Sequence, residues 1–124
     1  MKVALPTDDC IGMSPHGPRS GLFLVLEVDD SSGNIINREC RTVNVEHPRH
    51  EHKRHGAHEE HETDPEHARW HLAVLQALKD VDVVIAFRMG PIMVEGLQSL
   101  GKRVLIGVFV DKISEIPALL KEAG

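Results

Sequence analysis

Two nearly uninterrupted apolar runs in the second half of the chain constrain its fold most strongly. Residues 81–87 (VDVVIAF) and 102–110 (KRVLIGVFV) each have the length of a strand. Such runs are typical of strands that are buried on both faces, as in a parallel sheet covered by helices. The segment between them begins with Gly90 and Pro91 and ends at Gly101, which predicts a helix. This strand–helix–strand order predicts a parallel pair joined by a right-handed crossover.

The remaining elements predict an α/β fold with a mixed sheet. Further strands are expected at 2–6, 22–30 and 35–45, the last two as a hairpin around the turn 30–34. Helices are expected at 63–80 and 111–124, and Pro117 should bend or shorten the second of these. The whole chain, 1–124, is thus predicted to form a single domain with a five-stranded sheet, one antiparallel strand and about three helices.

Charge and hydropathy narrow the range of partners. The formal net charge is −5, whereas nucleic-acid binding needs a concentrated basic surface, so no nucleic acid is expected. No apolar run approaches the ~20 residues of a membrane span, and no signal-peptide pattern opens the chain. We therefore expect a cytoplasmic protein without a membrane partner. In that compartment Cys10 and Cys40 are expected as reduced thiols, with a disulfide between them as the less favoured alternative.

Eight of the nine histidines lie in one stretch that ends at His71. Residues 46–63 lack apolar periodicity and predict a flexible loop. His67 and His71 lie in the expected helix, where their i, i+4 spacing allows both to bind one ion. Imidazoles together with nearby glutamates suit Zn²⁺, Ni²⁺ or Fe. The alternative is a solvated loop without a ligand. The candidate metal ligands are His47, His50, His52, His55, His58, His61, His67 and His71.

Polar residues and a cysteine follow the expected strands at their carboxyl ends, where ligands bind in open α/β sheets. A helix that begins at Gly90 offers backbone N–H groups to an anion. Cys10, as a thiolate, can bind a soft metal. Thr7, Asp8 and Asp9 after the first strand, and Val110 and Asp111 after the last, are expected at the same edge. The candidate ligand-binding residues are Cys10, Ser14, His16, Arg19, Arg88, Met89 and Gly90.

Several stretches resemble the nitrogenase iron–molybdenum cofactor biosynthesis family. They are MKVALPTDD, SPHGPRSGLFLVLEVDD, the histidine-rich segment and DVVIAFRMGPIMVEGLQSLGKRVLIGV, which together run from Met1 to about Val110. The resemblance implies a stand-alone member with a ribonuclease-H-like three-layer fold. It also implies binding of an iron–sulfur or molybdenum-containing cluster, and it places His16 in the family's SPH motif. The chain departs from the family at Gly17 and Pro18, and at 87–89, where the family usually has Gly-Gly.

Taken together, these features predict a non-catalytic protein that binds or carries a metal cluster or its precursor. The alternative is a buffer or chaperone for divalent metal ions that acts through the histidine-rich loop. A nuclease is disfavoured, because only Asp8, Asp9 and Asp111 stand at expected strand ends and Mg²⁺ sites need several converging carboxylates. A cluster-delivery protein is a candidate partner, and the chain is expected to be a monomer or a homodimer.

Overall fold

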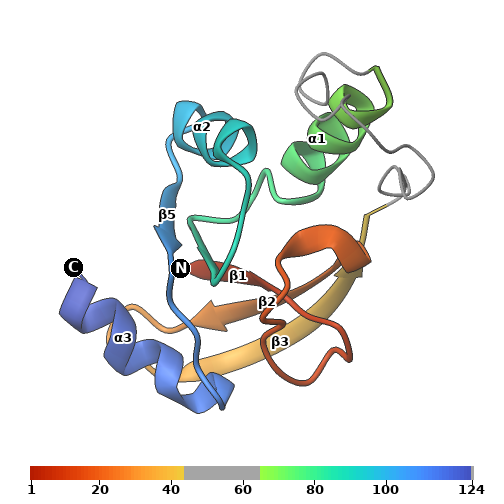
Figure 1. The fold of residues 1–124 in the computed structure, drawn as a ribbon. Coiled ribbons are helices and arrows are strands. Elements are labelled where there is room, and N and C mark those ends of the chain that lie inside the picture. Colours follow the sequence, from red (N-terminus) through yellow and green to blue (C-terminus); the bar gives the residue numbers. More distant parts are fainter. Residues whose placement is uncertain (44–64, 124) are drawn as a thin grey trace.

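The computed structural model describes residues 1–43 and 65–123, and its five strands form one mixed sheet (Figure 1). The strand order is β3-β2-β1-β4-β5. β2 is antiparallel to both of its neighbours, whereas β1, β4 and β5 run parallel to one another. The strands are β1 (Lys2–Pro6), β2 (Leu22–Val28), β3 (Ile35–Thr42), β4 (Val83–Ala86) and β5 (Arg103–Ile106).

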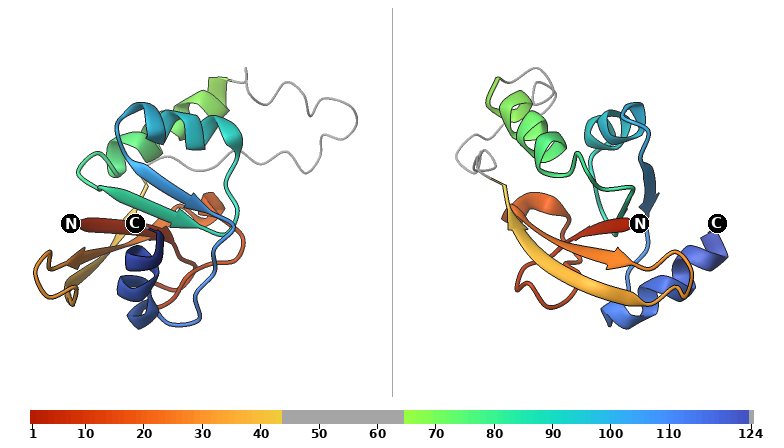
Figure 2. Two further views of the ribbon diagram at one scale, coloured as in Figure 1. Left: turned by 90° about the vertical axis from the view of Figure 1, so that its left-hand side faces the viewer. Right: turned by 180° about the vertical axis from the view of Figure 1, so that it is seen from behind.

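Helices cover both faces of this sheet. Figure 2 shows α1 and α2 together on one face and α3 on the opposite face. The helices are α1 (Pro65–Ala77), α2 (Pro91–Ser99) and α3 (Ile116–Ala123), and the short 3₁₀ helices are η1 (Pro18–Ser20) and η3 (Ile113–Glu115). The predicted five-stranded mixed sheet with three helices is confirmed. The predicted histidine-rich loop, 46–63, lies outside the described residues.

Alternation along the strands divides the core into two layers. On β1, Val3 and Leu5 pack in the cluster that contains Ile116 of α3, while Ala4 packs in the cluster that contains Trp70 of α1. Successive side chains of a strand point to opposite faces, so a sheet covered on both sides needs apolar residues at every position. All of Val83–Ala86 in β4 is buried for this reason.

The buried face of α1 and the turn after it is centred on Trp70 and excludes Leu72. Trp70, Val74 and Leu78 are buried at i, i+4, i+8 spacing, whereas Leu72 is 55% exposed. Tryptophan buries more apolar area than leucine, so the stripe that contains it faces the sheet. Among the described residues, no helix combines the length and the apolar character needed to cross a bilayer.

Two boundaries near the carboxyl terminus differ from the expectation. β5 ends at Ile106 and is only partly buried, because it is the edge strand and Gly107 turns the chain at φ 81°. Residues 108–110 leave the sheet, and Val110 packs on the α3 side. The last helix begins at Ile116, so Pro117 lies in its first turn, where a missing N–H is harmless, and does not bend it.

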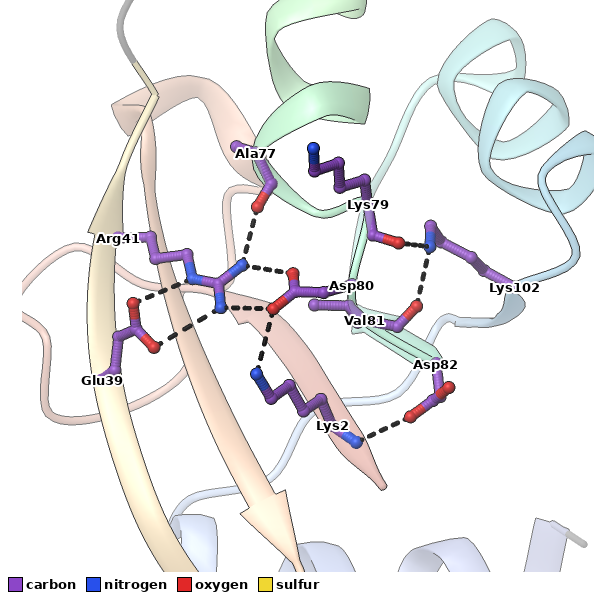
Figure 3. A network of polar contacts seen from close by, with 9 residues as sticks. All are labelled: Lys2, Glu39, Arg41, Ala77, Lys79, Asp80, Val81, Asp82 and Lys102. Carbon is purple, nitrogen blue, oxygen red and sulfur yellow. Dashed lines mark hydrogen bonds and ion pairs between the residues drawn. The ribbon is translucent and has the colours of Figure 1, made fainter.

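A polar network ties the end of α1 to the sheet (Figure 3). Arg41 of β3 donates to both oxygens of Asp80, at 2.7 and 2.9 Å, and to the carbonyl of Ala77 at 2.8 Å. Lys102 is 8% exposed and donates to the carbonyls of Lys79 and Val81 at 2.9 and 2.8 Å. Both cations therefore satisfy carbonyl groups at or just beyond the carboxyl end of α1, where helices leave them without partners.

This network predicts an acid-sensitive contribution to stability. Hydrogen bonds from Arg41, and next from Lys2, hold the pKa of Asp80 well below its usual range. A carboxyl with a lowered folded-state pKa stabilises the fold above about pH 4, and that stability is lost as the pH falls toward the folded-state pKa. Arg41→Gln should therefore lower the free energy of unfolding by about 1 kcal/mol at neutral pH, because the pair is partly exposed.

Urea denaturation of both proteins at about pH 7 and about pH 3 checks this expectation. The difference between them should be smaller at the lower pH, because the Asp80 carboxyl of the unfolded chain is then largely protonated while that of the folded wild type is still ionised. An equal difference at both pH values would contradict a role for the Asp80 carboxylate.

Candidate functional site

A pocket of about 340 Å³ lies on the α1 and α2 side of the sheet. Three segments far apart in the sequence form it: the connection from β1 to β2, the first half of α1, and the connection from β4 into α2. Its lining residues are His16, Pro18, Arg19, Trp70, His71, Arg88, Met89, Gly90 and Met93. Five of the seven predicted ligand-binding residues, namely His16, Arg19, Arg88, Met89 and Gly90, thus line one pocket, together with His71 from the predicted metal ligands.

The connection that carries His16 is held against the β4–α2 connection by Gly17. Gly17 has φ 86°, and a Cβ built on it would lie 2.6 Å from the carbonyl oxygen of Arg88. Only glycine combines this backbone conformation with such a close approach. Ser14, which is 1% exposed, accepts the His16 N–H on its Oγ at 3.0 Å and donates its own N–H to the Pro6 carbonyl at 2.8 Å. Ser14 therefore positions the loop but is not a lining residue.

The start of α2 gives the pocket an electropositive wall. Gly90 is the N-cap, has extended backbone geometry and makes no side-chain capping hydrogen bond. Pro91 follows at the first helical position. The early N–H groups of a helix have no partner within the helix, and the helix dipole is positive at this end, so both favour an anion. Arg88 lies 5.8 Å from the centroid of the Phe87 ring, which itself packs edge-to-face on Phe109.

The side chains of the pocket combine nitrogen donors with polarizable surfaces. Arg19 and Arg88 supply guanidinium groups, and His16 and His71 supply imidazoles, while the described part of the chain places no aspartate or glutamate in the lining. Trp70 and Met93 are 2% and 3% exposed and extend into the core beneath the pocket. Arginine binds anions by charge-assisted hydrogen bonds, and thioethers and indoles make favourable contacts with soft groups. The pocket can hold an anion that has a polarizable surface.

The expectation of reduced thiols is wrong in this structure. Cys10 and Cys40 form a disulfide across 30 residues, with a Cα–Cα distance of 5.5 Å. The cause is topological, because the loop after β1 passes beside β3 at the edge of the sheet and brings the two cysteines within bonding distance. Cys10 therefore has no thiolate to offer to a metal while this bond is intact, and it does not line the pocket.

Other predicted residues lie away from the pocket. Thr7 is fully buried, and Asp9 accepts the N–H groups of Ile11 and Gly12 at 2.9 and 3.1 Å, so both hold the loop together. The Gly12 N–H, and next that of Ile11, lower the pKa of Asp9. Val110 belongs to the core on the α3 side, since the chain leaves the sheet after Ile106. Among the strand-end connections that the structure describes, those after β1 and β4 line the pocket, together with α1.

The predicted metal ligands are only partly placed. His47, His50, His52, His55, His58 and His61 lie outside the described residues. His67 lies in α1, but its side chain is not among those described, so the expected pairing with His71 stays a prediction. Within residues 1–43 and 65–123, no group of three or more His, Cys, Asp or Glu side chains is arranged to hold a metal ion.

Three lining residues escaped the sequence interpretation: Pro18, Trp70 and Met93. Met93 falls in the first turn of α2, four residues after Met89. The helix start predicted at Gly90 could therefore have placed Met93 beside the predicted site. Trp70 is the only tryptophan and stands beside His71 in the sequence. The sequence places Trp70 in the expected helix. The packing of its ring beneath a pocket depends on the three-dimensional arrangement of α1 and η1, which the sequence does not show.

Known proteins place the chain in a family. The family model described as dinitrogenase iron-molybdenum cofactor matches residues 1–122. A solved structure described as "Crystal structure of PH0822" is similar, with a TM-score of 0.65 and 22% sequence identity over 99% of this chain and 92% of that chain. At this level of identity the likeness shows the fold alone. No curated protein gives a significant match.

Proposed function

Because the chain belongs to the dinitrogenase iron-molybdenum cofactor family, we propose that it binds and carries an anionic metal–sulfur cluster, or a precursor of one, as cargo. The family links the chain to iron–molybdenum cofactor biosynthesis at a general level. The finer proposal is that the cargo contains iron–sulfur or molybdenum units and that the protein does no chemistry on it. The strand order β3-β2-β1-β4-β5 also supports a ribonuclease-H-like classification of the fold.

The observation that carries this proposal is the charge of the pocket wall. Arg19 and Arg88 approach the same cavity from two different connections, and within residues 1–43 and 65–123 no described carboxylate lines it. A cluster of metal and sulfide with net negative charge gains from both guanidinium groups and from the start of α2. A bare divalent cation would be repelled by the same groups. The pocket therefore supports an anionic cargo more than an ion buffer.

The apolar part of the wall suits a sulfide surface. Met89 and Met93 carry thioethers, and Trp70 offers an indole ring. Sulfide ligands are large and weakly hydrated, so contact with such groups costs little desolvation. His16 and His71 contribute imidazoles to the described lining, and imidazole nitrogen is a common ligand of transition metals.

Metal and acid-labile sulfide analysis on untagged protein purified without oxygen tests the proposal. The wild type should contain iron or molybdenum together with sulfide. The double variant Arg19→Ala/Arg88→Ala should lose most of it, since each charged hydrogen bond contributes about 1.5–3 kcal/mol. Arg38→Ala is the matched control, because Arg38 is an exposed arginine on the edge strand β3. It should retain the wild-type content.

A chain that lacks residues 46–62 distinguishes a cluster carrier from a divalent metal-ion buffer. Under our proposal it keeps its metal and sulfide, because the pocket residues remain. Zinc or nickel without sulfide, lost together with this segment and unaffected by Arg19→Ala/Arg88→Ala, would overturn the cargo proposal in favour of a divalent metal-ion buffer. The delivery partner and the oligomeric state stay predictions.

A further inference from the structure

The disulfide and the pocket lie on opposite faces of the sheet but share one connection. Cys40 is paired with Leu24 in the register of β2 and β3, and directly paired residues point to the same face. Leu24 packs in the core on the α3 side. The disulfide therefore lies on that side. Trp70 and Met93, beneath the pocket, belong to the core on the α1 and α2 side.

The connection from β1 to β2 crosses from one face to the other. Its first part, drawn in red, passes on the α3 side before η1, in orange, reaches the α1 side (Figures 1 and 2). Met13 accordingly packs in the α3-side core, whereas His16 and Arg19 line the pocket. The disulfide thus fixes one end of the segment whose other end forms part of the pocket.

Thr7 connects these two ends by hydrogen bonds. The N–H of Cys10 donates to Thr7 Oγ1 at 3.0 Å, and Thr7 Oγ1 donates to the carbonyl of Gly12. The Oγ of Ser20, which follows Arg19, donates to the Thr7 carbonyl at 2.8 Å. Thr7 is 0% exposed, and the three bonds are partly buried. A displacement of Cys10 is therefore transmitted to the residues beside the pocket.

Cys10 has a backbone conformation that an unconstrained cysteine would not favour. Its φ is 64°, and within the described residues it is the one non-glycine residue with a positive φ. The left-handed region costs an L-residue about 1–2 kcal/mol. The disulfide and the Thr7 hydrogen bond hold Cys10 there. Once the disulfide is open, this local strain favours a different conformation of the loop.

The bond is open to attack from solvent at one of its sulfurs. Cys40 is exposed on the edge strand β3, while Cys10 is half-buried. Thiol–disulfide exchange requires an attacking thiolate to reach one sulfur and a thiolate to leave from the other. Disulfides in reducing compartments are usually transient and serve sensing or catalytic roles.

We propose that the Cys10–Cys40 bond is a site of thiol–disulfide exchange that controls the affinity of the pocket for its cargo. A thiolate of a dithiol reductant attacks Cys40 Sγ, and Cys10 Sγ leaves as a thiolate and takes up a proton. The mixed disulfide now joins Cys40 Sγ to one sulfur of the reductant. The second thiol of the reductant attacks that reductant sulfur and releases Cys40 as a thiol. The protein gains two electrons and two protons, and the reductant becomes a disulfide. The open form has a looser 7–20 segment and binds cargo more weakly.

The effect on the pocket rests on the proposed function, but the exchange itself does not. Native protein is treated with dithiothreitol, freed of it without oxygen, and compared with oxidised protein in three measurements. Free thiols are counted without denaturant, hydrogen exchange is followed in peptides from 7–20 and 83–86, and the Kd for tetrathiotungstate is measured by equilibrium dialysis. Cys10→Ser/Cys40→Ser is the permanently open control.

Two thiols should appear in the native protein, and exchange in 7–20 should accelerate about tenfold while 83–86 is unchanged. The Kd should rise about five- to tenfold, a typical coupling between two sites, and the double serine variant should match the reduced form. Thiols that appear only after denaturation, or unchanged exchange in 7–20, would overturn the switch. Equal Kd values in the two forms would overturn control of the pocket by the disulfide. Faster hydrogen exchange in 7–20 without binding of tetrathiotungstate by either form would support the redox-dependent loosening of this segment and overturn the proposed cargo class.

Discussion

Gly17→Ala is expected to lower the free energy of unfolding by about 2–5 kcal/mol and to abolish cargo binding. An L-residue at φ 86° costs about 1–2 kcal/mol, and relief of a clash with backbone costs about 1–3 kcal/mol more. The clash is with the Arg88 carbonyl oxygen, 2.6 Å from the added Cβ, and a carbonyl in a β4–α2 connection cannot rotate away as a side chain would. His16 and Arg88 would therefore move apart.

Two other glycines serve as matched controls in urea denaturation. Gly33 has φ 77° with nothing within 4 Å of the added Cβ, so Gly33→Ala should show the backbone cost alone. Gly12 has neither a positive φ nor a neighbour within 4 Å, so Gly12→Ala should be near neutral. A Gly17→Ala variant as stable as Gly33→Ala, with unchanged binding, would show that the contact with Arg88 does not shape the pocket.

Trp70→Ala is expected to be the most destabilising single substitution in α1, by about 3–5 kcal/mol. Trp70 is 2% exposed and packs with Phe23 and Val74 on the α1 side of the sheet. A Cβ placed on Gly21 would meet two of its ring atoms at 3.9 Å, which shows how closely the indole fills the space beside η1. Its loss leaves a cavity directly beneath the pocket.

Leu72→Ala provides the control in the same helix, because Leu72 is 55% exposed. That variant should change the free energy of unfolding by less than about 0.5 kcal/mol beyond helix propensity. The urea midpoints of the wild type, Trp70→Ala and Leu72→Ala test this expectation. If Trp70→Ala and Leu72→Ala cost the same, the packing of α1 described above is incorrect.

The parallel part of the sheet was predictable, because apolar runs of strand length alternate with a helical segment. The apolar runs around Val83–Ala86 and Arg103–Ile106 predicted two parallel strands, and the first of them is buried throughout as expected, whereas the second is only partly buried. The end of β5 was less predictable. Its apolar run continues to Val110, and only the edge position of β5 and the turn at Gly107 separate the residues that pair from those that pack on α3.

The pocket was predictable from the rule that ligands bind beyond strand ends, which brought Arg19 and Arg88 together from distant segments. The role of the cysteines was not. Cys10 and Cys40 are separated by 30 residues, and nothing in their spacing shows that the loop after β1 returns to β3. Disulfides are rare in cytoplasmic proteins, which favoured the prediction of thiols. The fold brings the two cysteines close enough to form the bond.

The central claim, an anionic metal–sulfur cargo in this pocket, is tested most directly by the fluorescence of Trp70. It is the only tryptophan of the chain and lines the pocket. Oxidised protein is titrated with tetrathiomolybdate, with N-acetyltryptophanamide correcting for absorption. We predict saturable quenching by one equivalent, and an affinity about a hundredfold lower in Arg19→Ala/Arg88→Ala. Quenching that is not saturable, or is identical in the double variant, would contradict the account.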